Sequence, residues 1–231
     1  MNRALQAALL ASLCAGCATQ GTSSYTYTPN TARTVPNEKT VGRPQAIVWD
    51  ELVRELSKSF FVINNIERES RIINVSFNSN TPLEYVDCGR TRRTFAQGEK
   101  VETFEYDVAA SSTYKVATER QEHPAFSNYV LFRRETSLEG RSNIYVAPDP
   151  GDSSRTVVSV NTRYIWAVRV NGSNFAEHIS GNRFARGTQP ERNFSIIFST
   201  NKPSQPSSDL DRTICFGKGK LEGDILNMVR P

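Results

Sequence analysis

Residues 156–170 read TVVSVNTRYIWAVRV, and this stretch decides the fold. Its even-numbered positions from Val158 to Val170 are apolar or aromatic, apart from Thr162. The odd-numbered positions mostly carry polar or charged side chains. Such alternation predicts a β-strand with one face on a core and the other in water, which is typical of an antiparallel sheet.

Shorter patterns of the same kind predict strands on both sides of this stretch. They lie at residues 60–64, 71–77, 104–108, 114–116, 129–134, 143–147 and 194–199. Helical spacing of apolar residues predicts one helix at 45–57 and a C-terminal one around Leu221, Ile225, Met228 and Val229. We therefore expect an α+β fold, in which a curved antiparallel sheet of about seven or eight strands carries an N-terminal and a C-terminal helix.

The composition limits the classes of partner. The chain has 231 residues, and 28 Lys and Arg against 24 Asp and Glu give a formal net charge of +4. This excess is too small to indicate nucleic-acid binding. No apolar run reaches the ~18 to 20 residues of a membrane-spanning helix. The length suits one folded domain, which we place at residues 45–231.

The N-terminus has the pattern of a targeting signal. Arg3 precedes a short apolar stretch, Ala4 to Leu13, which is typical of a signal peptide. The stretch ends in Leu13-Cys14-Ala15-Gly16-Cys17, which resembles the lipobox of bacterial lipoproteins. The resemblance implies that residues 1–16 are removed and that Cys17 carries a lipid. An ordinary secretory signal cut near Ala18 is the alternative.

The lipid anchor would also set the location of the chain. In the lipoprotein family an Asp after the Cys retains the protein in the inner membrane, and Ala18 stands there instead. The resemblance therefore implies an outer-membrane lipoprotein that faces the periplasm. Residues 17–44 contain few aliphatic side chains and predict a flexible lipidated tether with a reach of roughly 30 Å. Docking of Tyr25 and Tyr27 on a partner is the alternative.

The remaining cysteines predict a disulfide bond. Cys14 would leave with the signal and Cys17 would be lipidated, so Cys88 and Cys215 are left. Two thiols in the oxidising periplasm favour one disulfide between them. A metal-binding pair or a free catalytic thiol are the alternatives.

Residues that could perform catalysis are scarce. His123 and His178 are the two candidates for a general base, and no G-x-S-x-G motif supplies a nucleophile. The run Gly217 to Lys220 lacks the spacing of a phosphate-binding loop. We expect no enzyme activity and no cofactor. A hydrolase that uses one of these histidines is the disfavoured alternative.

Basic and aromatic residues suggest a binding surface instead. Arginines cluster after Cys88 and again in the polar stretch 171–192, which predicts a long loop. The candidate surface consists of Arg90, Arg92, Arg93, Phe175, Arg183, Phe184 and Arg186. Guanidinium groups would suit an acidic protein partner, an anionic glycan or a lipid head group. Simple solvation of these charges is the alternative.

The start of the domain resembles a known lipoprotein family. A Trp-led helix is followed by Phe-Phe-Val-Ile-Asn and by Arg-Ile-Ile-Asn-Val-Ser-Phe, over residues 45–78. This order is similar to that of outer-membrane assembly lipoproteins of the BamC type, with the helix at 219–229 as a second likeness. The resemblance implies a helix-grip fold and a non-catalytic accessory subunit of an envelope complex. A binding module for a lipid, glycan or small ligand is the alternative function.

Overall fold

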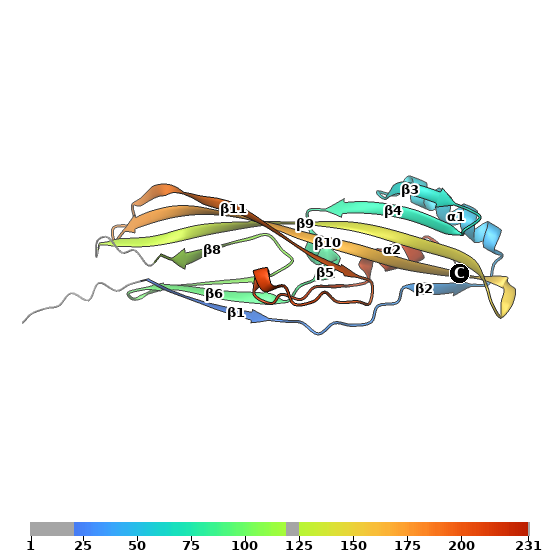
Figure 1. The fold of residues 1–231 in the computed structure, drawn as a ribbon, viewed down its shortest axis with the longest axis horizontal. Helices are drawn as coiled ribbons and strands as arrows, with labels where there is room; N and C mark the ends of the chain where they lie inside the picture. Colours follow the sequence, from blue (N-terminus) through green and yellow to red (C-terminus); the bar gives the residue numbers. More distant parts are fainter. Residues whose placement is uncertain (1–20, 119–124, 231) are drawn as a thin grey trace, which may run out of the picture.

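In the part of the chain that the structure describes, the fold is mostly antiparallel β-structure with two α-helices. The computed structural model describes residues 21–118 and 125–230 (Figure 1). The stretch at 156–170 is the middle of β10 (Asp152–His178), a strand of 27 residues. It pairs with β9 (Phe126–Asp149) almost from end to end. These two strands run the length of an elongated molecule (Figure 1).

Strands β9 and β10 form the centre of a seven-stranded sheet. The order is β11 (Arg183–Ser199), β10, β9, β4 (Ile72–Ser79) and β3 (Val62–Glu67). In addition, β2 (Glu38–Val41) pairs with β10 and β8 (Ser112–Ala117) pairs with β9. No sheet in the described part of the chain is strongly curled, so the predicted curvature is not confirmed.

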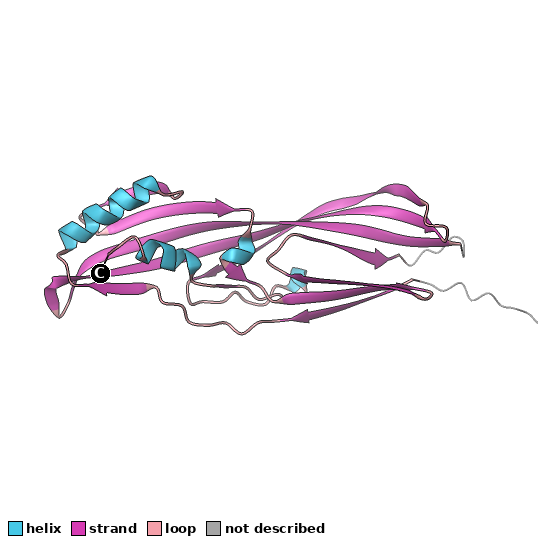
Figure 2. Cartoon of the chain, turned by 180° about the vertical axis from the view of Figure 1, so that it is seen from behind, coloured by secondary structure: helices cyan, strands magenta, loops and turns pink. Residues whose placement is uncertain are grey.

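Both helices cover the same end of the large sheet, which we call the helical end. They are α1 (Gln45–Lys58) and α2 (Lys220–Leu226), and two strands precede α1 in the chain (Figure 2). Leu52 and Leu56 of α1 and Ile225 of α2 share one core with Trp166 of β10. Burial of each such side chain contributes about 1.5–3 kcal/mol, so this core is the main stabilising element.

A second sheet covers the other end of the same face. Its strands are β1 (Thr22–Thr28), β6 (Arg90–Gln97) and β7 (Lys100–Asp107), in the order β1-β6-β7. The ring of Phe95 on β6 is buried against Tyr129 on β9, with 5.6 Å between ring centroids. The turn between β10 and β11 projects at this end, which we call the hairpin end (Figure 1).

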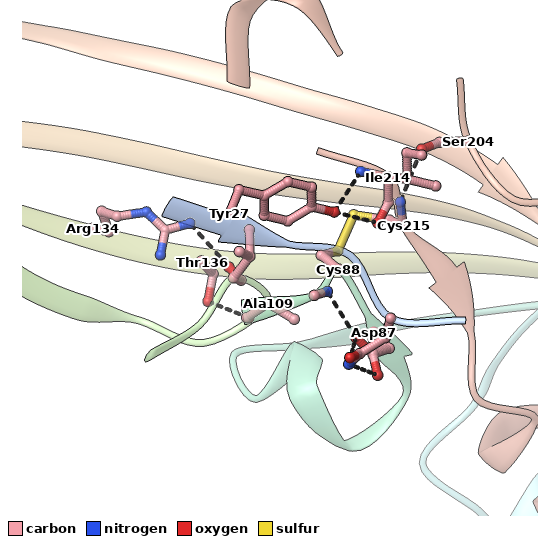
Figure 3. The surroundings of a disulfide bond; sticks show 12 residues. Tyr27, Asp87, Cys88, Ala109, Arg134, Thr136, Ser204, Ile214 and Cys215 are labelled. Carbon is pink, nitrogen blue, oxygen red and sulfur yellow. Dashed lines mark hydrogen bonds between the residues drawn. A yellow bond between two sulfur atoms is a disulfide. The ribbon is translucent and has the colours of Figure 1, made fainter. Parts of the chain in front are cut away.

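The predicted disulfide is confirmed and lies between the two ends. Cys88 and Cys215 are bonded, with their Cα atoms 4.1 Å apart (Figure 3). Cys88 directly follows β5 (Val86–Asp87), and Cys215 directly precedes β12 (Phe216–Gly217). Strands β5 and β12 pair with each other. The bond therefore fixes the start of β6, the middle strand of the three-stranded sheet, to the segment that leads into α2.

The prediction of a flexible tether at 17–44 is wrong for residues 21–44. Strand β1 pairs with β6 along its whole length, and β2 pairs with β10. The backbone amide of Ile214 also donates a hydrogen bond to the hydroxyl of Tyr27 over 3.1 Å. The segment is ordered by pairing with distant strands rather than by its own apolar content. The predicted signal peptide at 1–16 and the lipid site at Cys17 lie outside the described residues.

Two other predictions about the strands are wrong. The expected loop at 171–192 is a β-hairpin, in which β10 and β11 pair as far as Glu177 and Arg183. The predicted pair of strands at 129–134 and 143–147 is the single strand β9, because Gly140 lies within the strand under the ring of Phe77. No helix among the described residues is long and apolar enough to cross a bilayer.

Candidate functional site

A groove with three arginines lies between the two sheets. It has a volume of about 450 Å³. We call it the arginine groove, and its charged and aromatic lining includes Arg93, Arg134, Arg192, Tyr25, Tyr106, Tyr114 and Phe132. Two other depressions of similar or larger volume are lined mostly by uncharged residues, and each has one carboxylate.

Arg93 lies between two tyrosine rings. Strand alternation turns this side chain toward the large sheet, while its neighbours Arg90 and Arg92 face away. The guanidinium carbon is 4.2 Å from the ring centroids of both Tyr25 and Tyr114. Its Nε donates a hydrogen bond to the hydroxyl of Tyr106 over 3.0 Å. These contacts hold a flat cation in one orientation at the wall of the groove.

Arg134 is the most buried of the three arginines, with 6% of the residue exposed. Its Nη2 donates a hydrogen bond to the carbonyl of Val108 over 2.9 Å, and its Nη1 donates one to Ser112 Oγ over 3.1 Å. The guanidinium also lies 4.9 Å from the ring centroid of Tyr106. Within residues 21–118 and 125–230, no carboxylate oxygen lies within 4.0 Å of it. A buried cation is thus held by neutral acceptors.

The rim of the groove carries charges of both signs. Arg192 on β11 is exposed and lies 5.7 Å from the ring centroid of Phe132. Asp209 and Asp211 also line the groove and are exposed. Asp211 approaches Arg93 to 3.6 Å, which is a loose ion pair. The rim acids therefore offset only part of the positive charge.

Burial adjusts the pKa values of the lining residues. It lowers the pKa of Arg134, and it raises the pKa of Tyr114. Burial and then the nearby Asp211 carboxylate raise the pKa of Tyr25. Burial acts to lower the pKa of Arg93, but the neighbouring Tyr106 and Tyr114 raise it overall. At neutral pH Arg93 and Arg134 remain cations, and Tyr25 and Tyr114 remain neutral hydroxyls.

The residues of the predicted binding surface do not form one surface. Arg90 and Arg92 face outward and pair across the strands with Asp107 and Glu105, at 3.5 and 3.4 Å. Arg93 alone lines the arginine groove.

The other predicted residues lie at the hairpin end. The ring of Phe175 packs against Tyr129, with 5.7 Å between centroids, and Arg183 lies 5.3 Å from the Phe175 ring. Phe184 and Arg186 are exposed on β11. Phe175 is thus partly buried, while Phe184 and Arg186 are exposed at the hairpin end.

The structure places the histidine that it describes away from the arginine groove. His178 lies at the hairpin end, where its Nδ1 is 2.8 Å from Ser180 Oγ, and His123 lies outside the described residues. In the described ranges, no three His, Cys, Asp or Glu side chains are grouped closely enough to hold a metal ion. What the groove offers chemically is fixed guanidinium donors and tyrosine hydroxyls, which bind anions.

Comparison with known proteins gives no further assignment. No family model, no curated protein and no solved structure matches this chain.

Proposed function

We propose that this chain is a non-catalytic lipoprotein of the outer membrane that binds an acidic segment of an envelope protein in the arginine groove. The observation that supports this function best is Arg134. Removing a guanidinium from water is costly unless it is paired, and here its partners are carbonyl and hydroxyl groups. A carboxylate that entered the groove would supply the missing counter-charge.

The groove geometry favours an anion over a neutral ligand. Arg93 and Arg192 are held by aromatic rings rather than by strong ion pairs. A guanidinium binds carboxylate through two parallel hydrogen bonds, and ordering by a ring lowers the entropy lost when such a pair forms. The positive wall and the ordered side chains therefore suit an acidic peptide segment.

The exposed rim favours a group presented by a larger partner. Small ligands are usually buried over most of their surface, whereas Arg192 and both rim aspartates are open to solvent. The volume of about 450 Å³ does fall within the range of small-molecule sites. An anionic glycan, lipid head group or other small ligand is therefore the second candidate.

The location rests on the N-terminal sequence. The run Leu13 to Cys17 supports lipidation, and Ala18 supports the outer membrane. The order of α1 followed by the β3–β4 hairpin is in keeping with the resemblance to helix-grip accessory lipoproteins. A passive anchor combined with a binding groove is what an accessory subunit requires.

Site-specific cross-linking in intact cells tests the proposal. A photoreactive amino acid in place of Asp209 would lie on the rim of the groove, and one in place of Ile197 would be an exposed control on β11. We expect a discrete adduct from the first position only. Arg192→Glu should abolish this adduct by repulsion. Arg163→Glu makes the same charge change at another exposed strand position and should leave it intact.

Two outcomes would contradict the proposal. An adduct that survives Arg192→Glu would show that the partner does not use the groove charge. Equal adducts from positions 209 and 197 would indicate non-specific contact. The small-ligand alternative predicts no adduct, and it predicts a bound anion in native mass spectrometry that is lost in the Arg192→Glu variant.

A further inference from the structure

We infer that the hairpin end rests on the surface of the lipid bilayer, through Ile179 and Phe184 at the turn between β10 and β11. This inference rests on the proposed lipid anchor at Cys17. It adds a second membrane contact, made by the folded body itself, and it fixes the orientation of the elongated molecule. The occupant that we assign to this apolar tip is a bilayer that contains anionic phospholipid.

The described part of the chain begins at Gly21, close to the turn between β10 and β11. A Cβ atom on Gly21 would lie 3.0 Å from the Cβ of Ala117 and 3.7 Å from the amide oxygen of Gln97. The Gln97 side chain donates a hydrogen bond to the carbonyl of Phe126 over 3.2 Å. The ring of Phe126 is in turn 5.1 Å from that of His178. Gly21 and the hairpin turn therefore lie at the same end of the molecule (Figure 1).

Only a short stretch of chain separates Gly21 from the proposed lipid site at Cys17. Cys17 precedes Gly21 by four residues, so the two can be at most about 14 Å apart. The roughly 30 Å reach expected of a tether over residues 17–44 no longer applies, because β1 begins at Thr22. A lipid on Cys17 would therefore hold the hairpin end close to the head groups of the same leaflet.

The turn between β10 and β11 exposes large apolar side chains. Ile179 is 81% exposed and Phe184 is 49% exposed. Exposed aliphatic and aromatic side chains next to basic residues are typical of surfaces that enter the interfacial region of a bilayer. Arg183 supplies the positive charge, and it attracts anionic head groups. The tip thus matches a phospholipid surface in both apolar character and charge.

Backbone hydrogen bonds order the turn between β10 and β11. The amide of His178 donates to the carbonyl of Asn182 over 2.8 Å, and that of Ile179 donates to the carbonyl of Ala125 over 2.9 Å. An ordered tip loses little entropy when it contacts the membrane. Because about eight residues of β10 separate Val170 at the groove from this tip, the arginine groove lies roughly 25 Å along the strand from the proposed membrane contact.

Fluorescence quenching by lipids tests the inference on the intact mature chain. The Ile179→Cys variant would place an environment-sensitive fluorophore at the tip, and Ile197→Cys is the control on the same strand pair. Cys88 and Cys215 are bonded, and Cys17 would be blocked by lipid, so the new thiol is the one available for labelling. The labelled proteins are reconstituted into vesicles of phosphatidylethanolamine and phosphatidylglycerol with brominated acyl chains.

We expect several-fold stronger quenching and a blue-shifted emission at position 179, with neither at position 197. Adding Phe184→Ser to the tip-labelled protein should weaken the quenching. A label at 179 that is as hydrated as the label at 197 would overturn the inference, and so would equal quenching at both. The mass of the purified chain is measured first, because a chain without lipid would instead refute the proposed anchor and, with it, this contact.

Discussion

The hydroxyl of Tyr164 lies 2.9 Å from both carboxylate oxygens of Glu222, and both residues are fully buried. Thr200 donates a second hydrogen bond to this carboxylate over 2.6 Å. Burial and the neighbouring Glu222 raise the pKa of Tyr164, so that its hydroxyl remains a donor. In the described part of the chain no basic group lies within 4.0 Å of Glu222, so hydrogen bonds and the first turn of α2 satisfy it.

Loss of the Tyr164 hydroxyl should therefore destabilise the helical end. Tyr164→Phe leaves a buried carboxylate with one donor fewer, which costs about 1–3 kcal/mol. Tyr145→Phe removes an exposed hydroxyl from β9 and should change the free energy of unfolding by less than about 0.5 kcal/mol. Urea unfolding followed by circular dichroism compares the two. Equal stability of both variants would show that the hydrogen bond between Tyr164 and Glu222 does not contribute to the free energy of unfolding.

Two glycines should respond to alanine in opposite directions. At Gly140 a Cβ would lie 2.0 Å from the ring of Phe77, so Gly140→Ala should cost about 1–3 kcal/mol. At Gly223, inside α2, the added Cβ would meet no atom within 4 Å apart from its chain neighbours and the backbone of its own helix. Gly223→Ala should therefore stabilise the protein by about 0.5–1 kcal/mol. Thermal unfolding measures both changes, and a neutral Gly140→Ala would contradict the close packing of Phe77.

The disulfide should contribute substantially to stability. It joins residues that are 127 positions apart, and a loop of this length is worth about 5 kcal/mol at most in the chain-entropy account. We expect the Cys88→Ser, Cys215→Ser double variant to lose about 2–5 kcal/mol. Denaturant unfolding in the absence of reductant measures the loss. A thiol assay that finds two reactive cysteines in the protein purified without reductant would refute the bond.

Two carboxylates should make stability fall in acid. Burial opposes ionisation of Glu102, but Lys115 at 2.7 Å outweighs it and holds the pKa of Glu102 below its ordinary value of 4.5. In the same way, Lys100 and Tyr129 hold the pKa of Glu177 low against the effect of burial. Since both pKa values are lower in the folded state, this stabilisation is complete above about pH 4.5 and is lost as the pH falls further.

The acid dependence can be measured by melting temperature against pH. Replacement of both glutamates by glutamine should flatten the profile below pH 4.5 and lower stability at neutral pH by on the order of 1 kcal/mol for each. Glu99→Gln, at an exposed turn between β6 and β7, is the matched control. If the melting temperature of the double variant depended on pH in the same way as that of the control, the proposed roles of the Glu102–Lys115 and Glu177–Lys100 ion pairs would be contradicted.

Features with a strong local signal could be predicted from the sequence. The alternation at 156–170 identified the middle of β10, because burial there follows the two-residue period of a strand. The pairing of Cys88 and Cys215 followed from counting thiols. Both inferences depend on short patterns or simple chemistry, and neither needs to know which strands lie side by side.

Features that depend on distant pairing could not be predicted. Strand β1 contains few apolar residues, and its order comes from β6 and from the partial burial of Tyr25 and Tyr27. The hairpin of β10 and β11 was not predicted for a similar reason, because residues 183–192 are exposed on both faces of the hairpin. Polar composition therefore indicated a tether and a loop where hydrogen-bonded strands exist.

The arginine groove is the clearest case of this limit. Its lining includes residues of strands β1, β6, β7, β8, β9, β10 and β11, which the fold brings together. Arg93 was selected from the sequence, but the run of nearby arginines gave no sign that this one faces inward. Arg134 and Arg192 could have been found only from their register opposite β8 and β10.

The central claim, a lipid-anchored envelope protein, is tested most directly by the mass of the N-terminal peptide from chain isolated from bacterial membranes. The account predicts a peptide that starts at Cys17 and carries a diacylglyceryl group, and Cys17→Ala should abolish this species. An unmodified chain that begins at any other residue would contradict the anchor, the location and the membrane contact of the hairpin end.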